Sequence, residues 1–168
     1  MTQEFNKLVT FRLADDLFAA DIFAVERVLR YQSPRALPDV PPWIEGVIEY
    51  QQRVIPVVNL RRRFELAERA PAPDTRVVVL TARGEWIGIV VDSVLEVSSV
   101  DTNQISPPPR FFRGLAGEYL KGIVRRGEGQ RLIIVLDVEQ LLSATERIAL
   151  QLGSARGTPI AGGAVVDA

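Results

Sequence analysis

The feature that most constrains the fold is an internal repeat. Residues 8–28 match residues 77–97 at a constant shift of 69 positions. The shift also carries the turn residues Asp15-Asp16 onto Gly84-Glu85. A constant shift through apolar runs and turns alike favours a duplicated unit over the general similarity of short β-rich segments. We therefore expect two similar lobes.

The repeat continues further along the chain at slightly larger shifts. Residues 45–48 resemble residues 121–124 at a shift of 76, and residues 53–60 resemble residues 131–138 at a shift of 78. The increase requires only a longer crossover and a longer hairpin turn in the second half. We expect lobes at about 5–66 and 75–137, which pack together because lobes of about 70 residues are marginally stable alone.

Short apolar runs separated by turn residues predict an all-β fold. The predicted strands are 8–13, 17–20, 46–50, 54–58, 76–81, 86–97, 119–125 and 131–136, and residues 22–29 are expected to form a helical turn followed by a strand. Apolar residues at helical spacing predict a closing helix at 138–150. Residues 151–168 are rich in Gly and Ala, have little to bury, and are expected to form a disordered tail.

Composition narrows the possible functions. The formal net charge of −1 argues against nucleic-acid binding, which requires a basic surface. The chain has no cysteine, which excludes thiolate metal sites, and no histidine, which removes the commonest general base and metal ligand. We expect no metal, no cofactor and no catalytic residue, although a carboxylate- or lysine-based enzyme stays open. No stretch approaches the roughly 20 apolar residues of a membrane helix. We therefore expect a soluble, cytoplasmic protein that does not insert into a membrane.

The chain contains six sequence blocks at suitable spacing: Leu8–Leu13, Ala20–Val28, Ala36–Ile48, Val54–Arg61, Gly88–Val97 and Tyr119–Ile123. No single block is specific, but their order, spacing and total length are. Together they resemble the CheW family over about residues 5–150.

The resemblance implies a single domain at 1–150. It would contain two five-stranded SH3-like barrels with a hydrophobic groove between them and a C-terminal helix. It further implies a non-catalytic adaptor in a bacterial chemosensory array at the inner membrane. The implied partners are the regulatory domain of a CheA-type histidine kinase and the cytoplasmic tip of a chemoreceptor.

The resemblance also implies partner-binding positions. Val25 and Val28 lie in the segment where the family contacts partners, and Arg53 follows the corresponding hairpin turn. The family usually has arginine and glycine where this chain has Gln51 and Gln52, which predicts a different turn shape.

Two further positions depart from the family. The family commonly has an acidic residue at the position of Arg27 and aspartate at the position of Asn59. Together with Gln51 and Gln52, these changes predict an altered set of partners.

Two alternatives to the adaptor remain open. One is a regulatory β-barrel domain that binds a small ligand between the lobes. The other is a hydrolase that uses carboxylates of Asp92, Glu96 or Asp137, although a solvated strand face explains the first two more simply. By the same reasoning we expect Trp43 to pack in the core and Arg61–Arg63 to form a solvated helix face.

Overall fold

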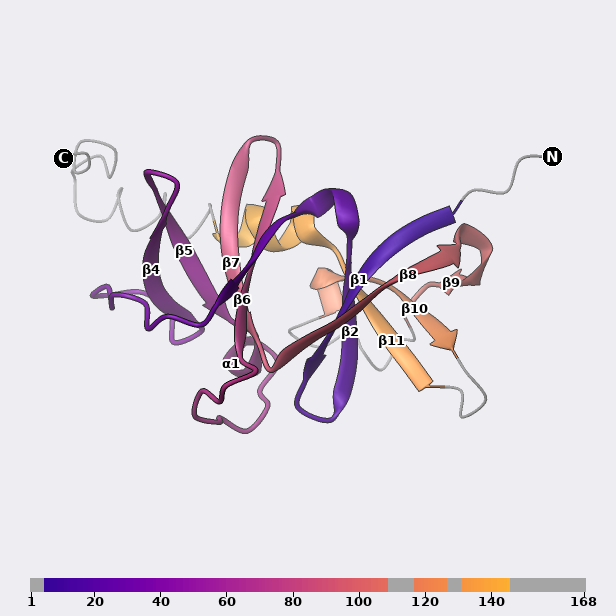
Figure 1. Cartoon of the computed structure of the whole chain (residues 1–168), viewed down its shortest axis with the longest axis horizontal. Helices are drawn as coiled ribbons and strands as arrows, with labels where there is room; N and C mark the ends of the chain where they lie inside the picture. The colour runs from indigo at the N-terminus through magenta and orange to yellow at the C-terminus, as the bar shows by residue number, and fades with distance from the viewer. Residues whose placement is uncertain (1–4, 109–116, 127–130, 146–168) are drawn as a thin grey trace.

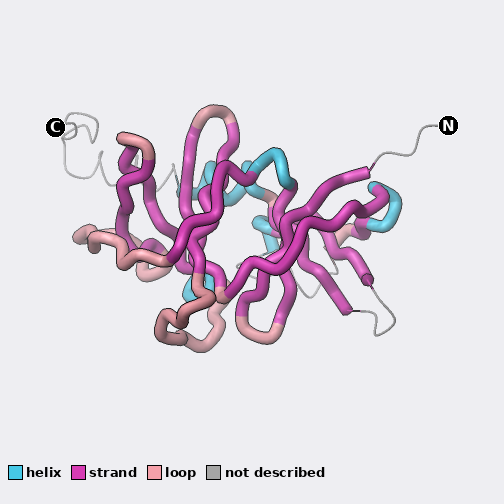
Figure 2. The backbone as a smooth tube through the Cα atoms, in the orientation of Figure 1, coloured by secondary structure: helices cyan, strands magenta, loops and turns pink. Residues whose placement is uncertain are grey.

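The computed structural model describes residues 5–108, 117–126 and 131–145. Strands dominate this part of the chain (Figures 1 and 2). The strands are β1 (Phe5–Leu13), β2 (Asp16–Asp21), β3 (Val25–Arg30), β4 (Ile44–Tyr50), β5 (Arg53–Asn59), β6 (Arg76–Ala82), β7 (Glu85–Val91), β8 (Ser93–Asp101), β9 (Ile105–Ser106), β10 (Leu120–Arg126) and β11 (Arg131–Leu136). The helical segments are η1 (Ile22–Ala24), α1 (Leu60–Arg63), η2 (Thr102–Gln104), η4 (Gly117–Tyr119) and residues 138–145.

The strands form two sheets, one of six strands in the order β8-β1-β2-β11-β10-β9 and one of five in the order β3-β6-β7-β5-β4. The two-residue strand β9 is the sixth member of the larger sheet, where five strands were predicted. An all-β fold with two lobes and a C-terminal helix is thereby confirmed.

The two sheets do not coincide with the predicted lobes at 5–66 and 75–137. The hairpin β1–β2 pairs with β8 and β11 from the second half of the chain, and the hairpin β6–β7 pairs with β3 and β5 from the first half. Each half of the chain therefore contributes its first hairpin to the sheet completed by the other half. Figure 1 shows β2 and β7 leading into strands of the opposite sheet.

Strand register supports the duplication in detail. A β-bulge interrupts the pairing of β3 with β6 between Val25 and Arg27, and another interrupts β1 with β8 between Thr10 and Phe11. The extra residues are Glu26 and Leu95, which are 69 positions apart. Because a bulge changes register and strand direction at one point, its presence at equivalent positions is strong support for a repeated unit.

One hydrophobic cluster joins the two sheets. Phe11 and Phe18 from the six-stranded sheet, Leu80 and Ile89 from the five-stranded sheet, and Leu141 from the closing helix are all buried in it. Burial at roughly 25 cal/mol per Å² of apolar surface makes such a shared core the main source of stability. The predicted helix at 138–150 is confirmed for residues 138–145, whereas residues 146–150 and the predicted tail at 151–168 lie outside the described residues.

Candidate functional site

Strand β3 carries three of the predicted partner-binding residues and lies at one edge of the five-stranded sheet. Arg27 is exposed and the side chain of Val28 is 39% exposed. Val25, by contrast, is half-buried and packs against the main core. Because of the bulge, Glu26, Arg27 and Val28 follow one another as exposed residues of β3.

Phe23 was missed in the sequence-based selection, although it lies two residues before Val25. It belongs to η1, which Asp21 caps by accepting a hydrogen bond of 2.8 Å from the Phe23 amide. Its side chain is 90% exposed, the highest value among the exposed large hydrophobic residues of the described structure. A phenylalanine between a capping aspartate and a strand is the signal that could have identified it.

The turn between β4 and β5 keeps a conformation that glycine normally favours. Gln51 and Gln52 form a two-residue turn with φ of 48° and 65°. Left-handed backbone at both positions is typical of the type I′ hairpin turn. Both exposed glutamines adopt a conformation that costs about 1 kcal/mol each, and the expected difference from the family's turn stays a prediction.

Arg53, which follows this turn, is held by the neighbouring hairpin. Its guanidinium lies 4.2 Å from the ring centre of Trp86 and donates a hydrogen bond of 3.1 Å to the carbonyl oxygen of Gly84. Trp86 also packs against Tyr50, with ring centres 5.4 Å apart. Arg53 thus joins the tips of two hairpins, while three strands separate β4 from β3 in the sheet.

Asn59 is buried and caps α1. Its side-chain oxygen accepts a hydrogen bond of 3.0 Å from the amide of Arg62, and its side-chain nitrogen donates one of 2.8 Å to Glu45. Aspartate could supply the cap but not the donor, and its charge would face the Glu45 carboxylate. The departure from the family at this position therefore acts inside the fold, away from Arg27 and the β4–β5 turn.

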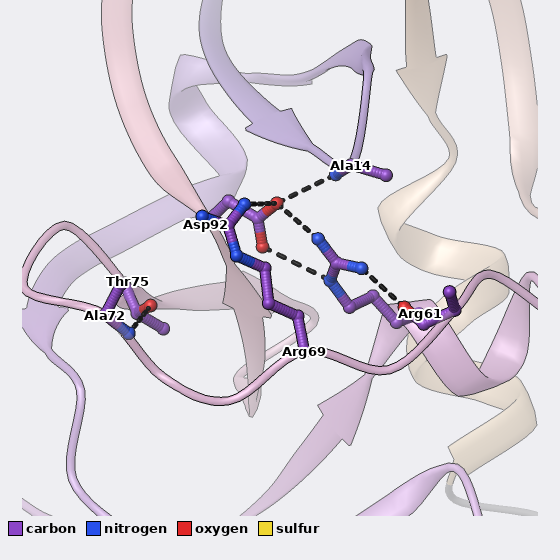
Figure 3. A network of polar contacts seen from close by, with 7 residues as sticks. Ala14, Arg61, Arg69, Ala72, Thr75 and Asp92 are labelled. Atoms are coloured by element: carbon purple, nitrogen blue, oxygen red, sulfur yellow. Dashed lines mark hydrogen bonds and ion pairs between the residues drawn. The ribbon is translucent and has the colours of Figure 1, made fainter.

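Asp92 forms a polar joint between the sheets (Figure 3). Its carboxylate accepts hydrogen bonds from Nε and a terminal nitrogen of Arg61, at 3.3 and 2.6 Å, and from the amide of Ala14, at 2.8 Å. Arg69 lies 3.9 Å away. The exposed fractions are 12% for the Arg61 side chain and 17% for that of Asp92, so the predicted solvated faces are wrong at both residues.

The carboxylates considered for hydrolysis do not line one pocket. Glu96 is exposed on β8, and Asp137 caps the closing helix by accepting a hydrogen bond of 3.1 Å from the Gln140 amide. A carboxylate-based hydrolase needs two such groups around one cleft. Asp92 and Asp137 line two different pockets, and Glu96 lines neither of them.

Arg63 lies at the seam between the sheets. Its guanidinium is 4.5 Å from the ring centre of Tyr119 and 5.4 Å from that of Trp43, and it donates a hydrogen bond of 2.8 Å to the Tyr119 hydroxyl. Burial raises the pKa of Tyr119, and the Arg63 hydrogen bond opposes part of that rise. Trp43 packs against the main core, as predicted.

Within residues 5–108, 117–126 and 131–145, no group of three or more acidic side chains is placed to hold a metal ion. None of the helices in the same ranges is long and apolar enough to cross a membrane. The fold and surface together define a class of protein: a duplicated two-sheet β protein with an exposed aromatic side chain beside an edge strand.

Comparison with known proteins identifies the family. The family model described as the CheW-like domain matches residues 7–146. The chemotaxis protein CheW of Treponema pallidum is 32% identical over 144 residues, which cover 83% of this chain and 84% of that protein. The chemotaxis protein CheW of Klebsiella aerogenes is 35% identical over 141 residues, covering 84% of each chain.

A solved structure agrees with these sequence matches. The scaffolding protein TtCheW from Thermoanaerobacter tengcongensis superposes with a TM-score of 0.71 at 33% identity, over 79% of this chain and 84% of that chain. The chain belongs to the CheW-like family. It is a non-catalytic scaffold of chemotaxis, of the kind that couples receptors to the kinase CheA.

Proposed function

We propose that this chain binds the regulatory domain of a CheA-type histidine kinase and the cytoplasmic tip of a chemoreceptor. In this proposal it works on the cytoplasmic side of the inner membrane, within receptor arrays. Membership of the CheW-like family supports both partners. The proposed function requires no covalent step, because the protein acts by binding its partners and holding them in a fixed arrangement. Several weak contacts in an array together give one stable assembly.

The observation that carries the proposal is the exposed segment from Phe23 to Val28. An aromatic side chain that is 90% exposed leaves a large apolar area in water, and Val28 adds a second apolar group nearby. Exposed aromatic residues of this kind are typical anchors of protein interfaces, where burial recovers the hydrophobic free energy. Arg27, the residue before Val28, adds an exposed positive charge.

The same segment supports an altered partner specificity. Arg27 stands where the family commonly has an acidic residue, so a partner suited to the family would meet a charge of the wrong sign. Gln51 and Gln52 are exposed as well and lack a fixed charge. Because Asn59 is buried, we base the proposed change of specificity on Arg27 and on the two glutamines.

Titration calorimetry with a kinase regulatory domain and a receptor-tip fragment tests the proposal. Phe23→Ala should weaken binding at least 10-fold, because the anchor is lost. Leu132→Ala is the matched control, since Leu132 is 45% exposed on β11 of the other sheet, and it should change affinity less than 2-fold. Equal affinities for the Phe23 variant and the unchanged protein would exclude the β3 surface.

A charge reversal tests the specificity separately. Arg27→Glu should raise the affinity for a kinase or receptor from a conventional CheW system. Arg125→Glu, at an exposed position of β10, should not raise it. Tight binding of the unchanged protein to both conventional partners, unaltered by Arg27→Glu, would refute the altered specificity and leave the adaptor function standing.

A further inference from the structure

A pocket of about 280 Å³ opens between the six-stranded sheet and the start of the closing helix. Its floor is apolar and includes Leu8, Val135 and Val138. Its polar lining is mainly acidic, with Asp21, Asp137 and Glu139 against one basic residue, Lys121. We call it the β11 pocket.

The internal repeat supplies a second pocket at the equivalent place in the five-stranded sheet, with a volume of about 250 Å³. Five residues of each pocket correspond through the shifts of 69, 76 and 78 positions. The pairs are Asn6 with Thr75, Asp21 with Val90, Lys121 with Glu45, Asp137 with Asn59, and Glu139 with Arg61. We call this counterpart the β5 pocket.

One wall of the β5 pocket is an extended segment of the chain itself, residues 68–71. Charged groups hold this segment: Arg62 pairs with Glu68 at 2.7 Å, and Arg69 lies 3.9 Å from Asp92. Arg61 also donates a hydrogen bond to the carbonyl oxygen of Ala67. The geometry of the β5 pocket therefore suits a peptide segment that lies across it and is fixed by ion pairs.

The β11 pocket has no such wall in the described part of the chain. Each residue that lines it belongs to β1, β2, η1, β9, β10, β11 or the start of the helix at 137–139. Residues 68–71 cover one side of the β5 pocket. None of residues 5–108, 117–126 and 131–145 covers the equivalent side of the β11 pocket.

The β11 pocket is the more acidic of the two, because three acidic residues face one lysine there, whereas the β5 pocket is lined by three acidic and three basic residues. Glu139 occupies the place of Arg61, Asp137 that of Asn59, and Asp21 that of Val90. Asp21 and Asp137 each use one carboxylate oxygen to cap a short helix, and Glu139 lies 3.5 Å from the exposed Arg83. A segment that is complementary to this lining carries a basic side chain.

We propose that the β11 pocket receives an extended segment of a partner protein that carries an arginine or lysine side chain. The basic group pairs with the acidic lining, and small apolar neighbours cover the floor. The pocket is lined mainly by the six-stranded sheet and meets the segment from Phe23 to Val28 at Ala24, but Phe23, Arg27 and Val28 do not line it.

The test uses the full chain and a seven-residue capped peptide, Ala-Ala-Arg-Ala-Pro-Ala-Pro, which copies residues 67–73 with Glu68 replaced by alanine. Nuclear magnetic resonance should show amide shift changes at Ile105, Lys121 and Glu139, with a dissociation constant on the order of 1 mM. The same peptide with glutamate in place of arginine should not bind. Higher salt should weaken binding, because the pocket rim is open to solvent.

Two variants with opposite expected signs exclude a simple loss of folding. Lys121→Glu should strengthen binding about 3-fold or more, and Glu139→Lys should weaken it by a similar factor. Lys7→Glu is the matched control, because Lys7 is exposed on β1 and points away from Asn6 and Leu8 through strand alternation. It makes the same change of net charge as Lys121→Glu and should leave the affinity unchanged.

Four results would overturn the proposal. The first is an equal response to the arginine and glutamate peptides, and the second is strengthening by Lys7→Glu as large as that by Lys121→Glu. The third is peptide binding only after removal of residues 146–168, which would assign the pocket to the chain's own end. The fourth is the same pattern of amide shifts on concentrating the protein alone, which would assign it to a second copy.

Discussion

Replacing Thr10 with valine should make the protein more stable. Thr10 lies on β1, an inner strand of the six-stranded sheet, is 2% exposed, and its hydroxyl has no hydrogen-bond partner within the described structure. Burying an unsatisfied hydroxyl costs about 1–3 kcal/mol, which an apolar group of the same shape avoids. The repeat shows that valine fits, because the equivalent residue is Val79, which is fully buried on β6.

We expect Thr10→Val to raise the free energy of unfolding by about 1 kcal/mol, which corresponds to about 2–4 °C in Tm for a chain of this size. Urea and thermal unfolding measure both quantities. The matched control is Thr145→Val, since Thr145 is 4% exposed but donates a hydrogen bond of 3.0 Å to the carbonyl oxygen of Leu141. That variant should lose about 1 kcal/mol.

The opposite signs of the two changes are the decisive result. Both substitutions remove a buried threonine hydroxyl and add a methyl group, so packing alone predicts similar effects. A loss of stability in Thr10→Val comparable to that in Thr145→Val would refute the reasoning, because it would mean that the Thr10 hydroxyl is already well bonded.

Three further changes follow from the geometry. Gly46→Ala should lower the free energy of unfolding in urea by more than about 3 kcal/mol, because the added Cβ would lie 2.1 Å from the carbonyl oxygen of Arg35. A variant within about 1 kcal/mol of the unchanged protein would contradict this contact. Asp92→Ala should cost about 2–3 kcal/mol by leaving half-buried Arg61 without its carboxylate, and a cost below 0.5 kcal/mol would argue against the joint. Because burial raises the pKa of Tyr119, the folded state holds the phenol proton more strongly than the unfolded state does. The free energy of unfolding should therefore fall as the pH rises from about 10 through the folded-state pKa. Tyr119→Phe should flatten this dependence in denaturation curves at pH 9–12.

The element order could be predicted from the sequence because the repeat is local information. Apolar alternation and turn residues located ten of the eleven strands at least in part, and the shift of 69 placed Glu26 and Leu95 at equivalent positions before their bulges were seen. β9 escaped prediction because two residues are too short to show a period.

The exchange of hairpins could not be predicted, for a physical reason that the repeat itself supplies. β1 meets β8 with the same register and bulge as β6 meets β3. Pairing within a half or between halves therefore satisfies the same local pattern, and apolar periodicity does not distinguish the two. Asn59 illustrates the same limit at one residue, since its role depends on Glu45, 14 positions away in sequence.

The exposure of the candidate site residues was partly predictable, whereas their binding of partners stays a prediction. The sequence pointed to the segment around β3 and to the β4–β5 turn, and Arg27, Val28, Gln51 and Gln52 are exposed in the structure. Exposure of Phe23 depends on how η1 crosses between the sheets, which is a property of the tertiary fold.

The exchanged hairpins also determine how the molecule can come apart. A cut within residues 68–74, which connect α1 to β6, would leave two fragments. Each fragment would contain a hairpin whose sheet partners lie in the other fragment. The fragments would remain bound as a complementing pair, and neither would retain a complete sheet on its own. The two lobes should therefore unfold as one cooperative unit. In the intact chain, residues 68–74 keep the two halves at a high effective concentration, so the pairing of the halves does not depend on protein concentration.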